Sequence, residues 1–73
     1  MKDIIEKGII AHCEGNISLH RANIEVYMKS ATGIGDHSCI MQAVEKELSE
    51  ISKYQGMIEA WKSMSVPKHA PAY

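Results

Sequence analysis

The chain has 73 residues, 45% of them hydrophobic, and a formal net charge of −1 at pH 7. This length limits it to one small domain, and domains of this size bury little surface when they fold alone. The charge shows no excess of Lys and Arg, so the chain lacks the feature by which proteins neutralise a phosphate backbone. We therefore expect a module that associates with itself or docks on another protein, and no nucleic-acid partner.

The first seven residues are interrupted by charges, and no segment approaches the roughly 20 apolar residues of a membrane-spanning helix. Two cysteines, Cys13 and Cys39, are too few for a disulfide framework. We expect reduced thiols, no membrane partner and a soluble intracellular protein.

Residues 3–30 carry apolar side chains at alternating spacings of three and four, which is the period of one helix face. Gly15 and Asn16 interrupt the helical composition, and a helix could end there. The apolar stripe keeps its phase across both residues, which favours an unbroken or slightly kinked helix over a break. The stripe consists of Ile10, Cys13, Ile17, His20, Ile24 and Tyr27.

Residues 31–36 are predicted to form a turn before a second helix over residues 37–64. Glycines supply the backbone freedom of the turn, and oxygen-bearing side chains cap the new helix. Asn23 and Glu25, near the end of the first helix, are expected to form hydrogen bonds with the turn. The turn and capping residues are thus Asn23, Glu25, Gly33, Gly35, Asp36, His37 and Ser38.

The second helix carries a matching apolar face, with its charged side chains, Glu47 and Glu50 included, mainly on the opposite face. Pro67 and Pro71 end helical structure, so residues 65–73 are predicted to be an extended tail. The chain should be all-α, a two-helix antiparallel hairpin that assembles into a four-helix bundle or larger oligomer. Its expected interface residues are Ile10, Ile17, His20, Ile24, Tyr27, Val44, Leu48, Ile51, Ile58 and Trp61.

Four residues have side chains that zinc prefers: His12, Cys13, His37 and Cys39. In one hairpin the two pairs would lie some 25 Å apart at 1.5 Å per residue, so only an antiparallel oligomer could join them. We expect no metal or cofactor, and read Cys13 as a small core residue and His12 as a solvent-facing one.

Three segments carry a resemblance: HRANIEVYM at residues 20–28, GIGDHS at 33–38 and EKELSEISKY at 45–54. Together they resemble a family of short proteins encoded by marine bacteriophages, cyanophages especially, over about residues 19–61. The family has no established activity. The resemblance therefore implies a phage source and a helical hairpin, and it supplies no catalytic residues.

These observations predict a non-enzymatic interaction and assembly module located in the host cytoplasm or the virion. A virion-associated accessory structural protein is the first specific hypothesis. The second is an early phage protein that binds and modulates a host enzyme or transcription component. A small metal-binding or redox module is the third.

Overall fold

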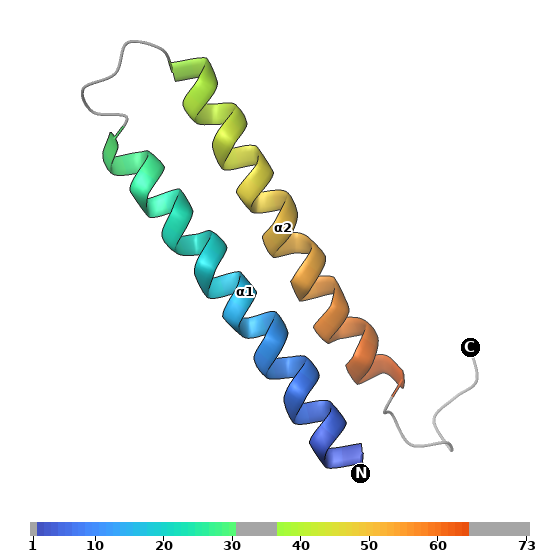
Figure 1. Cartoon of the computed structure of the whole chain (residues 1–73). Coiled ribbons are helices and arrows are strands. Elements are labelled where there is room, and N and C mark those ends of the chain that lie inside the picture. Colours follow the sequence, from blue (N-terminus) through green and yellow to red (C-terminus); the bar gives the residue numbers. More distant parts are fainter. Residues whose placement is uncertain (1, 31–36, 65–73) are drawn as a thin grey trace.

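The structure is a computed structural model that describes residues 2–30 and 37–64, with side chains from residue 39 onward in the second segment. Helix α1 runs over Lys2–Ser30 and helix α2 over His37–Met64. The two helices lie antiparallel, side by side (Figure 1). The predicted all-α hairpin is confirmed, while the turn at 31–36 and the tail at 65–73 lie outside the described residues.

Helix α1 continues through Gly15 and Asn16 without a break. The side-chain nitrogen of Asn16 donates a hydrogen bond to the carbonyl of His12, one turn earlier, at 2.9 Å. The amide therefore bonds to the helix backbone instead of competing with it. The favoured alternative of a continuous helix is confirmed, and a break at Gly15 is not seen.

The seam between α1 and α2 contains a very small core. Cys13 and Ile17 of α1 and Ile51 of α2 are the buried hydrophobic side chains of the part of the chain that the structure describes. The rest of the seam is half-buried, because two helices alone cannot enclose it. These half-buried apolar residues are Ile10, Ile24, Tyr27, Val44, Ile58 and Trp61.

The seam on α2 differs from the predicted apolar face at one position. Leu48 was placed on the apolar face, yet its side chain is 53% exposed, and Glu47 lies in the seam instead. Neighbouring positions differ by about 100° around a helix, so one step exchanges a seam position for a solvent position. The residues that face α1 repeat at alternating spacings of four and three: Ile40, Val44, Glu47, Ile51, Tyr54, Ile58 and Trp61.

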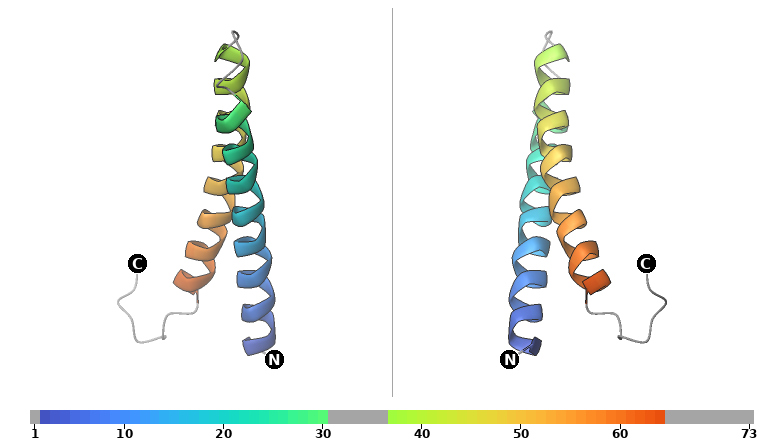
Figure 2. Two further views of the ribbon diagram at one scale, coloured as in Figure 1. Left: turned by 90° about the vertical axis from the view of Figure 1, so that its left-hand side faces the viewer. Right: turned by 90° about the vertical axis from the view of Figure 1, so that its right-hand side faces the viewer.

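Seen from the side, the helices separate toward the ends that carry the start of α1 and the end of α2 (Figure 2). Neither helix is both long enough and apolar enough to cross a membrane.

Candidate functional site: a polar cluster in the helix seam

A polar cluster bridges the two helices near the middle of the seam. Oε1 of Glu47 on α2 lies 2.7 Å from Nδ1 of His20 and 3.0 Å from Nδ2 of Asn23, both on α1. Because a carboxylate only accepts hydrogen bonds, the imidazole and the amide both donate. One oxygen thus holds two residues of the opposite helix.

Aromatic and charged neighbours from α2 extend this cluster. Oε1 of Glu50 lies 4.0 Å from Nε2 of His20 and 3.0 Å from Nζ of Lys53. The ring of Tyr54 stacks on His20 with a centroid separation of 6.3 Å. Nζ of Lys53 lies 4.8 Å from the centre of the same tyrosine ring.

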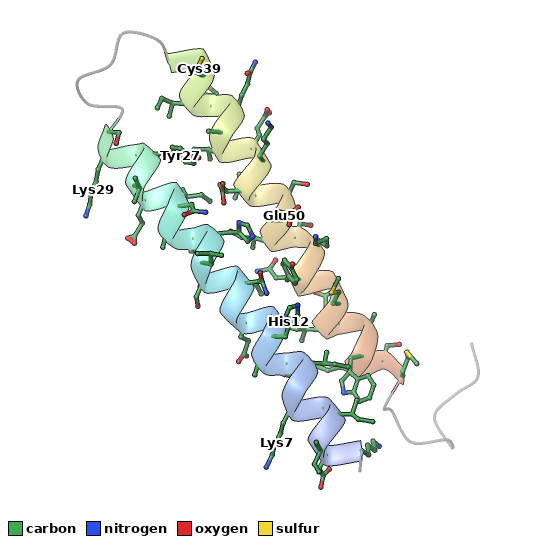
Figure 3. The ribbon with its side chains drawn as sticks, viewed as in Figure 1. Lys7, His12, Tyr27, Lys29, Cys39 and Glu50 are labelled. Atoms are coloured by element: carbon green, nitrogen blue, oxygen red, sulfur yellow. The ribbon has the colours of Figure 1, made fainter. Side chains whose placement is uncertain are left out.

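His12 closes the cluster on α1, with its ring edge-on to Tyr54 at a centroid separation of 5.7 Å. Figure 3 shows His12 and Glu50 on the two helices in the middle part of the hairpin. We call this set of residues the His20 cluster: His12, His20, Asn23, Glu47, Glu50, Lys53 and Tyr54.

The cluster can fix the register of the hairpin. Sliding α2 by one turn, about 5.4 Å, would take Glu47 away from both of its donors. A polar side chain at a seam position specifies one alignment in this way, at some cost in stability.

Two hydrogen bonds hold the pKa of Glu47 below its ordinary value of 4.5: the bond from Asn23 has the larger effect and the bond from His20 the smaller one. The hydrogen bond and the charge of Glu50 raise the pKa of Lys53 above 10.5. Glu47 therefore stabilises the fold above pH 4.5 and loses this effect as pH falls through its lower folded-state pKa. Lys53 stabilises the fold below pH 10.5 and loses this effect as pH rises through its higher folded-state pKa.

We expect the hairpin to lose stability on acidification from pH 6 to below 4.5, and part of this loss to depend on Glu47. Glu47→Gln keeps an oxygen acceptor but removes the ionisable group, so its stability should fall less over the same range. Urea unfolding followed by circular dichroism at several pH values measures the difference. Equal pH dependence in the two proteins would contradict this account of Glu47.

The predicted site residues are only partly brought together. Asn23 was expected to bond to the turn, but its amide nitrogen bonds to Glu47 on α2. Glu25 is exposed, and the other predicted turn and cap residues lie outside the described side chains: Gly33, Gly35, Asp36, His37 and Ser38. Glu47, Glu50 and Tyr54 were not predicted as site residues. Extending the four-and-three spacing of α2 through polar residues would have found Glu47 and Tyr54.

The four metal candidates are spread along the hairpin. Sγ of Cys13 lies 4.0 Å from the sulfur of Met57, whereas Cys39 lies 18 positions before Met57, or about 27 Å along α2. Cys13 is fully buried, His12 is exposed, and both cysteines are thiols. Within the described residues, no three His, Cys, Asp or Glu side chains are grouped as a metal site requires.

An apolar groove of about 420 Å³ lies where the helices separate. Four positions of α1 and four of α2 line it, and apolar atoms dominate its surface. These residues are Gly8, Ile9, His12, Cys13, Met57, Ala60, Trp61 and Met64.

Comparison with protein-family models, curated proteins and solved structures finds no significant match to this chain.

Proposed function

We propose that this protein is a non-enzymatic assembly module that associates with itself through helix faces left exposed by the hairpin. The contrast between its small core and its apolar surface supports the proposal. Three hydrophobic side chains are buried among the described residues, whereas these large ones are exposed: Ile4, Ile5, Leu19, Val26, Met28, Met41, Leu48, Met57 and Met64.

The energetics of a two-helix unit point the same way. Burial of apolar surface contributes about 25 cal/mol per Å², while ordering each residue costs about 1.5 kcal/mol. Scaffolds of this size rarely gain enough from one small core, and oligomerisation is a common remedy. Covering the exposed apolar side chains with another copy would supply the missing burial.

Light scattering on a sizing column, with helicity recorded on the same sample, tests this proposal. The monomer has a mass of 8.1 kDa, so a dimer would have twice that mass, 16.2 kDa. We expect a helical species of 16.2 kDa or more. A helical monomer at high micromolar concentration would contradict self-association.

The resemblance to phage proteins extends the proposal to an accessory role in the virion. Such a protein should be present in purified particles at a fixed ratio to the capsid protein, which quantitative mass spectrometry measures. Absence from particles, together with co-purification of one host protein, would favour the alternative of a host-modulating protein.

A further inference from the structure

We infer that α1 pairs with α1 of a second copy, antiparallel, through the face that it turns away from α2. This inference rests on the proposed self-association and names the surface that carries it. The face follows one stripe at spacings of four and three, and every member is exposed: Ile4, Gly8, Ala11, Gly15, Ser18 and Ala22.

Among the described residues, no close contact requires glycine at positions 8 and 15 of this stripe. A Cβ built on Gly8 or Gly15 meets no atom within 4 Å, and neither residue has a positive φ. Glycine in a helix interior is less stable than alanine by about 1 kcal/mol. Small side chains do allow two helix axes to approach to about 8 Å, the lower end of the usual range.

Large apolar side chains flank the stripe along one edge. Ile5, Leu19 and Val26 are 45%, 55% and 61% exposed. Ile5 and Leu19 lie one position after a stripe position and Val26 lies one turn after Ala22, where a coiled coil has its flanking residues. The outer face of α2, in contrast, is polar, with Gln42, Glu45, Ser49 and Ser52 exposed. The exposed large apolar side chains of α2, Met41, Leu48, Met57 and Met64, lie to the sides of this polar face.

The opposite edge of the stripe carries charges that select the orientation of the partner. Lys7, Glu14 and Arg21 are exposed at intervals of seven, and no ion pair joins them to another described residue. In an antiparallel two-fold pair each edge meets the same edge of the other copy. A two-fold axis midway between Gly15 and Ser18 then brings Glu14 near Arg21 of the second copy, twice over.

The same axis aligns the rest of the face. Gly15 lies opposite Ser18 of the second copy, Ala11 opposite Ala22, and Ile5 beside Val26. A parallel pair would instead place Glu14 near Leu19 and Arg21 near Val26, setting charges against apolar side chains. The charges of Glu14 and Arg21 therefore favour the antiparallel arrangement, and the small stripe residues allow the close approach.

The groove at the open end of the hairpin and the exposed Met41 and Leu48 on α2 offer no such complementarity. The groove lining has no Asp, Glu, Lys or Arg, and the edge beside Met41 and Leu48 carries Glu45 and Glu59, two charges of the same sign. The outer face of α1 is the surface on which a specific occupant, a second copy of this chain, is indicated.

Two matched glycine variants of the full chain test the inference. Gly15→Met places a long side chain in the proposed seam, and Gly56→Met places the same side chain on the outside of α2, where a Cβ also meets nothing within 4 Å. Overpacking a close contact should weaken the dimer by about tenfold or more in Gly15→Met alone. Light scattering over a concentration series gives the association constants, and circular dichroism verifies that both hairpins fold.

A charge exchange tests the orientation. Glu14→Arg and Arg21→Glu should each weaken association, because each single substitution places two like charges side by side in the dimer. The double variant should restore association, because positions 14 and 21 then carry opposite charges again. A dimer that Gly15→Met leaves unchanged, or a double variant no tighter than the single ones, would overturn this seam while self-association stands. A helical monomer of the unmodified chain would overturn self-association itself.

Discussion

Replacing Ile51 with Asp is expected to unfold the hairpin. Ile51 is 8% exposed and is the one buried apolar side chain that α2 contributes within the described residues. An unpaired charge at such a position costs about 3 to 5 kcal/mol, which is as much as the whole stability of many small domains. Circular dichroism should show loss of most of the helical signal at 25 °C.

Leu48→Asp is the matched control. The predicted apolar stripe treated Leu48 and Ile51 alike, but Leu48 is 53% exposed. Its replacement by Asp should leave the helical signal within experimental error of the unmodified protein, since exposed substitutions change stability by about 0.5 kcal/mol or less. Similar unfolding of both variants would place Leu48 in the core of an assembly and contradict the register described here.

Replacing Glu47 with Ala is expected to lower the thermal unfolding midpoint by on the order of 5 °C. The change leaves the ring nitrogen of His20 and the amide of Asn23 without the oxygen to which both donate. Half-buried donors without an acceptor are more costly than an absent hydrogen bond. Circular dichroism melting at pH 7 measures the shift.

Glu45→Ala controls for the loss of one acidic residue and for the helix propensity of alanine, because Glu45 is exposed on the same helix. Its midpoint should remain close to that of the unmodified chain. Asn23→Ala combined with Glu47→Ala should cost less than the sum of the single variants, since both remove the same bond. Equal shifts for Glu45→Ala and Glu47→Ala would show that the His20 cluster does not hold the helices together.

The apolar period of the sequence predicted the two helices and their antiparallel pairing, because hydrophobic spacing directly reports one face of a helix. It also identified Cys13, Ile17 and Ile51 as stripe residues, and all three are buried. The continuity of α1 through Gly15 followed from the unbroken phase of the stripe. These features depend on local periodicity and need no knowledge of the opposite helix.

Only the tertiary structure decided which side of the α2 stripe faces α1. Hydrophobicity favours Leu48 over Glu47, and the two positions differ by about 100° around the axis. The choice falls on Glu47 because His20 and Asn23, 27 and 24 positions away in sequence, lie opposite it and donate to its carboxylate. A carboxylate that is partly withdrawn from water, as Glu47 is, is less costly where such donors meet it. That pairing is a property of two helices in contact, so the sequence of one helix determines its apolar face, and the contact with the other determines its register.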